Sequence, residues 1–344
     1  MSHNGLVLVT GANGYVAART VEAFVKAGYS VRGTVRSKSS AKGLLDALSE
    51  YASRIEIVEV PDITVEGAFD EAVKGVDAIA HLAAPVSLSF TDPEPVLKSA
   101  IEGTLRALEA AHKESSVKSF VLMSSIAAVL STKEAPYTFT EADWNDEAGA
   151  VVAKLGKDAP SGMIYFASKA AAERTLWKFR DEKKPSFSVT SVNPAFVAGP
   201  PLILPTSFEN INLTTRIITD VYHGVPLAKS GIPGARPGYV DIRDVARLVV
   251  FAVQHPEKAN NERFIAASAY ALPQGVADIL RKAYPERAGI IEEGKPGEGY
   301  SPDHSFPRDG LVYDGSKAVR VTGQEYIPWE KTVLDTVEQL KAIL

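Results

Sequence analysis

Two residues in the middle of the chain have the types and the spacing that acid–base chemistry requires. Tyr165 and Lys169 are four positions apart in Gly162–Glu173, a segment of strong helix formers, so a helix would place them on one face. A phenol beside a fixed ammonium has its anion stabilised, so we expect the pKa of Tyr165 to move from about 10 toward the working pH. Tyr165 would then act as the general acid for a developing alkoxide.

A third polar partner is expected at the carboxyl end of a neighbouring strand, where ligands bind in open α/β sheets. The predicted strand Phe120–Met123 runs directly into Ser124 and Ser125. Either hydroxyl could donate to a carbonyl oxygen, and either could simply cap the turn after the strand. We expect both roles to be filled, one by each serine.

A glycine-rich loop follows the first apolar strand, Leu6–Thr10, and opens a helix. In Gly11-x-x-Gly14-x-x-Ala17, Gly11 permits a tight turn, Gly14 lets the backbone approach a pyrophosphate, and Ala17 lets the helix pack on the strand. The helix N-terminus adds free N–H groups and a positive dipole end. The alternative is an ordinary turn, but this context favours a dinucleotide site. Its binding residues are predicted to be Gly11, Asn13, Gly14, Tyr15 and Val16.

The end of the second strand indicates which dinucleotide is bound. An acidic residue there would accept from a ribose 2′-hydroxyl, and none occurs between Glu22 and Asp46. Arg36 stands there instead, with Lys42 beyond it, and a guanidinium matches a 2′-phosphate bidentately. A solvated basic strand end is the alternative. The sequence favours NADPH over NADH.

Both patterns have imitations elsewhere in the chain. Gly294-x-x-Gly297 lies among prolines with no strand before it, and Gly231-x-x-Gly234 has the same kind of context. Tyr313 and Lys317 repeat the four-residue spacing, but an Asp-Gly turn signal separates them. Strand and helix context therefore distinguishes the predicted site from its imitations.

The elements that must position these residues alternate strand and helix, which predicts a doubly wound parallel sheet, the Rossmann α/β fold. Strands are predicted at Leu6–Thr10, Val31–Val35, Ile55–Val60, Ala78–Leu82, Phe120–Met123, Ser188–Val192 and Glu262–Ala266. Helices are predicted at Tyr15–Ala27, Val65–Lys74, Glu94–Glu114, Gly162–Glu182, Ser207–His223, Ile242–Gln254, Pro273–Ala283 and Trp329–Leu344. We expect a dinucleotide-binding domain from 1–196, 238–262 and 328–344, and a smaller α/β substrate lobe from 197–237 and 263–327.

Composition excludes several classes of function. The 344 residues carry a formal charge of −5, which gives no attraction to nucleic acid or anionic membranes. There is no cysteine, and the six histidines show no pair at metal-ligand spacing, so no metal site is predicted and each histidine is expected at the surface or in packing. Without a leader or membrane-spanning pattern, a cytoplasmic monomer or homodimer is expected.

Several short motifs, in this order, give the chain a resemblance to a known family. They are Val9–Ala17, Val31–Ser37, Val60–Ile63, His81–Pro85, Ser124-Ser125, Tyr165-x-x-x-Lys169, Val192–Pro194 and Tyr239–Ala246. The chain resembles the extended short-chain dehydrogenase/reductases, specifically the dihydroflavonol reductase-like branch that includes fungal methylglyoxal and aldehyde reductases.

This resemblance implies roles for particular residues. Ser125 is implied as the catalytic serine, with Tyr165 as proton donor and Lys169 as its partner. Contacts with the cofactor are implied for Asp62, Ile63, Ala83, Ala84, Pro85, Pro194 and Val197. Asp62 could equally cap a helix before Val65. The positions that line the substrate pocket in these relatives hold Val86, Ile126, Leu130 and Phe196, all apolar, although core packing would also explain them.

Taken together, the sequence predicts an NADPH-dependent reductase that transfers hydride to an aldehyde or ketone. An apolar pocket without fixed charge suits an aryl or alkyl ketone or an α-dicarbonyl, and disfavours a carboxylate. Two alternatives stay open. One is an NAD-dependent sugar-nucleotide epimerase or hydroxysteroid dehydrogenase on the same fold, and the other is a non-catalytic NADP-sensing regulatory protein.

Overall fold

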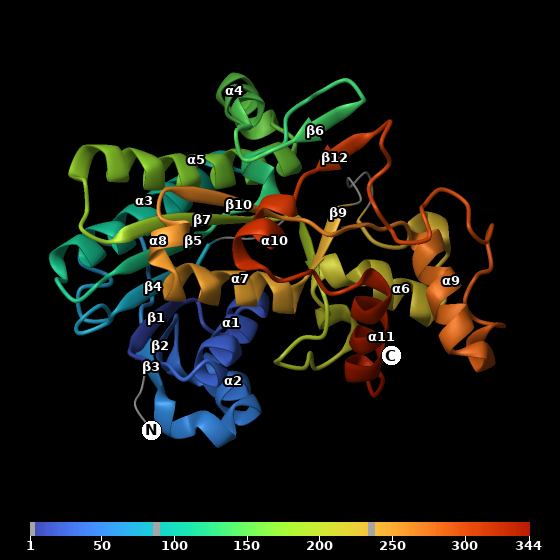
Figure 1. The fold of residues 1–344 in the computed structure, drawn as a ribbon, viewed down its shortest axis with the longest axis horizontal. Helices are drawn as coiled ribbons and strands as arrows, with labels where there is room; N and C mark the ends of the chain where they lie inside the picture. The colour runs from blue at the N-terminus through green and yellow to red at the C-terminus, as the bar shows by residue number, and fades with distance from the viewer. Residues whose placement is uncertain (1–3, 85–89, 233–237) are drawn as a thin grey trace.

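A parallel sheet of seven strands forms the centre of the computed structural model, which describes residues 4–84, 90–232 and 238–344 (Figure 1). The strand order β10-β7-β5-β4-β1-β2-β3 is that of a doubly wound sheet, so the predicted Rossmann fold is confirmed. The strands are β1 (Leu6–Thr10), β2 (Ser30–Val35), β3 (Ile55–Glu59), β4 (Ala78–His81), β5 (Ser119–Met123), β7 (Ser188–Pro194) and β10 (Glu262–Ala266).

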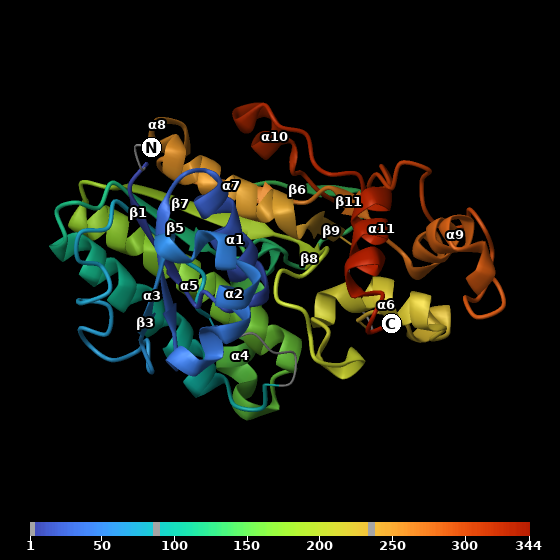
Figure 2. The ribbon, with the colours of Figure 1, turned by 90° about the horizontal axis from the view of Figure 1, so that it is seen from below.

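Helices cover both faces of this sheet (Figure 2). On one face, Leu108 of α3 (Pro93–Lys113) and Leu176 of α5 (Ser161–Lys183) share a core with the sheet. On the other face, Phe24 of α1 (Tyr15–Lys26) packs with α7 (Ile242–Gln254). Burial on both faces explains why β4, β5 and β7, which are buried along their whole length, contain no Asp, Glu, Lys or Arg.

A smaller group of elements lies beyond the carboxyl end of β7. It contains a three-stranded sheet of β8 (Phe196–Ala198), β9 (Gly238–Asp241) and β11 (Ala269–Tyr270), together with helices α6 (Arg216–His223), α9 (Pro273–Ala283) and α11 (Trp329–Leu340). The three helices share one apolar core, and they lie together at the right of Figure 1. The lobe boundaries stay a prediction, but these contacts argue for grouping α11 with the small lobe and all of β10 with the large one.

Four further α-helices and two short strands occur in the described ranges. They are α2 (Lys42–Ala47), α4 (Asp146–Leu155), α8 (Pro256–Ala259), α10 (Ser316–Thr322), and the short strands β6 (Tyr137–Phe139) and β12 (Leu311–Tyr313). β6 and β12 pair in parallel although they are far apart in the sequence. None of the helices in the described ranges is long and apolar enough to cross a membrane.

Two helix predictions need correction. Residues 65–74 form consecutive turns and no α-helix, because Gly67 has a left-handed φ of +74° that interrupts the helical path. In Ser207–His223 only Arg216–His223 is α-helical. The preceding residues form two 3₁₀ turns, the second begun by Asn212, whose side chain accepts from the Thr214 N–H.

Candidate active site

The carboxyl ends of four parallel strands meet at one edge of the central sheet. Gly11 follows β1, Ala83 follows β4, Ser124 follows β5, and Pro194 ends β7. Because the strands are parallel and neighbouring, the loops that leave them share one crevice. This is the position in which the sequence predicted a dinucleotide and a substrate.

The structure brings Ser125, Tyr165 and Lys169 together at this edge. Tyr165 and Lys169 lie one turn apart on α5, and the Lys169 Nζ is 5.9 Å from the centre of the Tyr165 ring. The Ser125 side chain makes a hydrogen bond with the Tyr165 phenol. Lys169 is buried, whereas Tyr165 is partly exposed as a residue.

The side chains of Ser124 and Ser125 make different contacts. Ser125 caps the 3₁₀ turn Ile126–Ala128, since its Oγ accepts from the Ala127 N–H at 3.1 Å, and the same side chain meets Tyr165. Ser124 does neither of these and donates to a carboxylate oxygen of Glu173 at 2.6 Å. The capping role therefore falls on Ser125, and which hydroxyl donates to a carbonyl oxygen stays a prediction.

Burial sets the proton affinities of the two α5 side chains. It raises the pKa of Tyr165, and the hydrogen bond from Ser125 opposes this rise without cancelling it. The expectation of a lowered Tyr165 pKa is therefore wrong, because the loss of phenolate hydration outweighs the stabilising contact. Burial also lowers the pKa of Lys169 to about 8. At neutral pH the phenol carries its proton, which is the form that a general acid needs.

A buried pair that sequence reasoning missed connects the first and fourth strands. The Thr10 Oγ1 accepts from the backbone N–H groups of Leu82 and Ala83 at 3.0 and 2.9 Å, and lies 3.0 Å from the Nδ1 of His81. With both lone pairs of its oxygen occupied, Thr10 donates its proton to Nδ1, so the His81 proton lies on Nε2. Burial, with the charge of Lys169, lowers the pKa of His81 to about 3 and keeps it neutral.

This pair locks the loop after β4 against the glycine loop. Thr10 and His81 each end a strand, and polar residues at the ends of two neighbouring strands were the available signal. His81 also packs between the rings of Phe69 and Phe120, which agrees with the expected packing role for a histidine.

The glycine loop has the geometry that its pattern predicts. Gly11 has a φ of +65°, and a Cβ there would lie 3.1 Å from the Cα of Ala83, so only glycine fits without strain. Gly14 begins α1 with no side-chain cap, which leaves the first-turn N–H groups, including those of Tyr15 and Val16, free for an anion. The Asn13 side chain donates to the carbonyl of Ser40 at 3.3 Å.

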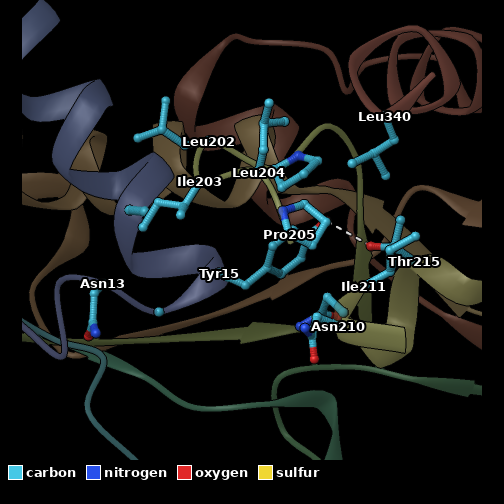
Figure 3. A pocket seen from close by; sticks show the side chains of 14 residues that line it. Asn13, Tyr15, Leu202, Ile203, Leu204, Pro205, Asn210, Ile211, Thr215 and Leu340 are labelled. Atoms are coloured by element: carbon cyan, nitrogen blue, oxygen red, sulfur yellow. Dashed lines mark hydrogen bonds between the residues drawn. The ribbon is translucent and has the colours of Figure 1, made fainter. Parts of the chain in front are cut away.

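The Tyr15 side chain extends away from this phosphate end. Its hydroxyl donates to the Gly199 carbonyl at 2.8 Å and lies 3.0 Å from the Thr215 Oγ1. Beside it lies a cavity of about 270 Å³ (Figure 3). Its lining is Asn13, Gly14, Tyr15, Ala18, Pro201, Leu202, Ile203, Leu204, Pro205, Asn210, Ile211, Asn212, Thr215 and Leu340. Of the predicted substrate residues that the structure describes, none lines this cavity, which adjoins the glycine loop at Asn13 and Gly14.

The basic residues in and after β2 differ in whether their charges already have partners. The exposed Arg36 guanidinium makes no hydrogen bond or ion pair with any residue in the described ranges. Arg32 is bound to Glu56 at 2.8 Å and to the carbonyls of Ala72 and Lys74. Lys42 is exposed and pairs with Asp46 at 2.5 Å. Arg36 is the guanidinium at this strand end that is available to a ligand.

The residues implied on the adenine side lie in a turn. The Asp62 Oδ1 accepts from the backbone N–H and the hydroxyl of Thr64, and these bonds lower the pKa of Asp62. Asp62 therefore closes a turn and caps no α-helix before Val65. Ile63 packs against Gly103 of α3, where a Cβ would lie 2.6 Å from its Cδ1.

The other implied positions surround the crevice to different depths. Ala83 and Ala84 are partly exposed beside Gly11, whereas Pro194 and Val197 are buried where β7 passes into β8. Pro85 and Val86 lie outside the described residues. Among the residues that the structure describes, no group of histidine and acidic side chains is arranged to hold a metal ion.

The predicted substrate residues have mixed surroundings. Ile126 and Leu130 belong to a buried apolar cluster with Phe139, so core packing alone accounts for their types. Phe196 is partly exposed, and its ring centre is 5.5 Å from that of Tyr239.

Tyr313 and Lys317, which have the same four-residue spacing as Tyr165 and Lys169, do not lie on one helix. Tyr313 ends β12 and Lys317 lies in α10, so the two share no helix face. The Lys317 ammonium binds the Arg263 carbonyl at 2.9 Å and Glu262 at 2.5 Å.

Known proteins match the chain over most of its length. The model of the NAD dependent epimerase/dehydratase family matches residues 7–267. The NADPH-dependent methylglyoxal reductase GRE2 of Saccharomyces cerevisiae is 32% identical over 346 residues, which cover 97% of each chain. Aldehyde reductase 2 of Sporidiobolus salmonicolor is 42% identical over 205 residues, which cover 58% of this chain and 59% of that protein.

A solved structure extends this likeness to three dimensions. The crystal structure of the yeast methylglyoxal/isovaleraldehyde reductase Gre2 complexed with NADPH has a TM-score of 0.84 to this chain, with 29% identity and 98% coverage of both. The relatives agree with the predicted enzyme class and cofactor. The chain belongs to the NAD dependent epimerase/dehydratase family, within which its relatives include the fungal reductases that the sequence resembles.

Proposed function

We propose that this chain is an NADPH-dependent carbonyl reductase that converts an aldehyde or ketone to an alcohol. The observation that carries the proposal is the meeting of Ser125, Tyr165 and Lys169 at the sheet edge beside the glycine loop. The reductase names of relatives that span nearly the whole chain support it. A non-catalytic NADP sensor would need the glycine loop but not this acid.

The residues present fit NADPH. Gly11 and the uncapped first turn of α1 offer a close backbone approach and free N–H groups to the pyrophosphate. Arg36 would take the 2′-phosphate with its unused guanidinium, and Lys42 would add a second positive charge. The remaining cofactor contacts are assigned to Asn13, Tyr15, Val16, Asp62, Ile63, Ala83, Ala84, Pro85, Pro194 and Val197. When bound there, NADPH supplies the hydride that reduces the carbonyl carbon.

The chain's own side chains manage the oxygen and the proton. Ser125 and Tyr165 donate hydrogen bonds to the carbonyl oxygen and stabilise the negative charge that develops on it. The Ser125 Oγ already accepts from the Ala127 N–H, so its own proton is available as a donor. Tyr165 then transfers its proton to the alkoxide. Lys169 stabilises the phenolate that remains, and it also donates to the ribose hydroxyls of the cofactor.

The substrate is proposed to be a hydrophobic aryl or alkyl ketone, or an α-dicarbonyl. Phe196 gives a partly exposed apolar surface near this edge, and Ile126 follows Ser125 directly. With Leu130 and Val86, these residues are proposed to form the pocket. An apolar pocket has no group to pair with a carboxylate. The methylglyoxal named for the yeast relative is an α-dicarbonyl.

Replacing Tyr165 with Phe tests the proposal. Tyr165→Phe should abolish NADPH oxidation with α-dicarbonyls and aryl ketones, while NADPH binding, followed by its fluorescence, stays close to wild type. Tyr51→Phe is a matched control on the separate 3₁₀ segment Ser49–Arg54. Near-normal turnover in Tyr165→Phe contradicts the proposed acid. A wild-type preference for NADH would favour the epimerase or hydroxysteroid dehydrogenase alternative.

Location and assembly complete the proposal. The absence of cysteine agrees with a cytoplasmic, reducing location, which cell fractionation would test. The chain is proposed to work as a monomer or homodimer with a small-molecule carbonyl as its partner, and light scattering coupled to size-exclusion chromatography would give the mass.

A further inference from the structure

A fully buried carboxylate lies behind the tyrosine–lysine pair. Glu173 is on α5, one turn beyond Lys169 and two turns beyond Tyr165, and its side chain is 0% exposed. Its Oε2 accepts from the Ser124 Oγ and the Asn193 Nδ2, both at 2.6 Å. Its Oε1 accepts from donors at 2.6, 2.9 and 3.3 Å, which belong to Arg263, Ser191 and Trp177.

These donors come from three adjacent strands as well as from α5 itself. Ser124 follows β5, Ser191 and Asn193 lie on β7, and Arg263 lies on β10. Each of these five groups donates a hydrogen bond, so both carboxylate oxygens of Glu173 act as acceptors here. Glu173 therefore ties the helix that carries Tyr165 to the strand ends that carry its partners.

The charge of Glu173 is balanced by Arg263, which is itself held in place. The Arg263 Nη1 donates to the carbonyls of Glu141 and Asp143 at 2.6 and 2.7 Å, and the guanidinium carbon lies 3.9 Å from the Trp144 ring centre. Since both charges are buried, removing either one alone would leave the other unpaired. Variants of this pair must therefore change both residues.

Asn193 extends the network to the reacting side chains. The same Nδ2 that binds Glu173 also donates to the backbone carbonyl of Ser125 at 3.2 Å. Both partners of Nδ2 are acceptors, which fixes the orientation of the amide. The Asn193 Oδ1 lies 3.1 Å from the Ser191 Oγ, whose single proton is directed to Glu173 at the shorter distance of 2.9 Å. The Ser125 backbone is thus held from the Glu173 side at the point where its side chain meets Tyr165.

We propose that Glu173 is a positioning residue which, through the Asn193 amide, fixes Ser125 against Tyr165. The proposal rests on the proposed reductase function and adds a residue to it. Tyr165 is held by α5 and Ser125 by the end of β5, so a link between these elements sets the separation of their two hydroxyls. Misplacing a reacting group by about 1 Å can cost about a hundredfold in rate.

Two double variants separate positioning from stability. Glu173→Gln/Arg263→Met removes both charges but keeps an amide oxygen for Asn193 and Ser124 to donate to. Glu173→Met/Arg263→Met has a similar shape and no acceptor. Both lack Arg263, so the loss of its contacts is common to them. We expect the glutamine pair to keep kcat within about threefold of wild type and the methionine pair to lose at least about tenfold, both with an unchanged KM for NADPH.

Equal kcat in the two double variants would overturn the proposal. If the methionine pair fails to fold, two single variants ask the same question. Asn193→Leu removes the link from Glu173 to Ser125 and leaves the ion pair intact. Trp177→Phe removes a donor to the same carboxylate without touching Ser125. We expect a large loss of kcat only in Asn193→Leu, and equal effects in the two variants would also overturn the proposal.

The ionisation of Tyr165 gives a readout that does not depend on turnover. Ultraviolet absorbance followed against pH reports the ionisation of all tyrosines in the chain. The contribution of Tyr165 is the difference between the titration curves of the wild type and of Tyr165→Phe. The Ser125 hydrogen bond stabilises the phenolate, so Asn193→Leu should raise the pKa of Tyr165, and Trp177→Phe should leave it unchanged. If Asn193→Leu leaves the Tyr165 titration unchanged, the positioning role of Glu173 is refuted. If instead the wild-type chain reduces no carbonyl, only the proposed reductase function is refuted, and the titration still tests the positioning role.

Discussion

Arg36 gives the sharpest test of how the chain would choose its cofactor. Its guanidinium has no partner among the described residues, so Arg36→Ala breaks no visible contact and should leave the melting temperature unchanged. A hydrogen bond to a charged group contributes about 1.5–3 kcal/mol, and solvent exposure favours the lower part of that range. A loss of about 2 kcal/mol corresponds to roughly a 30-fold rise in KM for NADPH.

NADH lacks the 2′-phosphate, so its KM should stay nearly constant in the same variant. The assay is steady-state NADPH and NADH oxidation at several salt concentrations, because a contact between exposed charges weakens as salt rises. Arg32→Ala is the matched control. Its guanidinium is already bound to Glu56 and two backbone carbonyls, so it should lower stability and leave the NADPH/NADH ratio intact. A ratio that moves less than about threefold in Arg36→Ala, or equally in both variants, would refute the assignment.

Three further outcomes are expected. Gly11→Ala should destabilise the fold by at least about 1–2 kcal/mol, because Gly11 has a left-handed φ and a Cβ there would press on Ala83. Gly289→Ala is the control, since a Cβ at Gly289 would meet open space, and thermal unfolding measures both variants. Tyr15→Phe should lose about 1–2 kcal/mol through its two hydroxyl contacts with little change in KM for NADPH, since the backbone N–H remains. For reduction, kcat/KM should fall as pH rises through about 8, because Lys169 then loses the proton that supports Tyr165.

The sequence predicted best the elements whose own pattern determines their structure. Ile242–Gln254, Glu262–Ala266 and Pro273–Ala283 were predicted with the bounds that the structure has. Each is a complete amphipathic helix or buried strand bounded by turn residues, so local pattern and tertiary packing agree. The helix predicted at Val65–Lys74 is absent for a local reason, because Gly67 has a positive φ that an α-helix does not allow.

Elements stabilised by distant partners could not be predicted in this way. β6 (Tyr137–Phe139) and β12 (Leu311–Tyr313) pair although about half of the chain separates them, and each has only three residues, too few to show a period of its own. The pKa of Tyr165 was missed for a related reason. Its spacing from Lys169 can be read from the sequence, but the burial that outweighs the Ser125 contact is a property of the packed fold.

Glu173 had a visible signal that the sequence analysis did not use. Tyr165, Lys169 and Glu173 recur at intervals of four, so a helix that buries one face must bury a lysine and a glutamate together. Charged residues are almost never fully buried without partners, so this spacing predicts hydrogen-bond donors on the neighbouring strands. What the sequence could not supply was the identity of those donors, since Asn193 and Arg263 meet the carboxylate only through the strand order.

The protonation states of Tyr165 and Lys169 decide the direction in which this site is ready to react. Carbonyl reduction requires the site to give a proton, and alcohol oxidation requires it to accept one. With its pKa raised by burial, Tyr165 holds its proton at neutral pH, and Lys169, with a pKa of about 8, is mostly protonated there. Both groups are then in the form that reduction uses. Oxidation needs the phenolate, whose population grows with pH, so the same two groups give the two directions opposite pH slopes. At neutral pH this pair is therefore ready to give a proton, and burial widens the pH range over which Tyr165 keeps its proton while narrowing the range over which Lys169 keeps its charge.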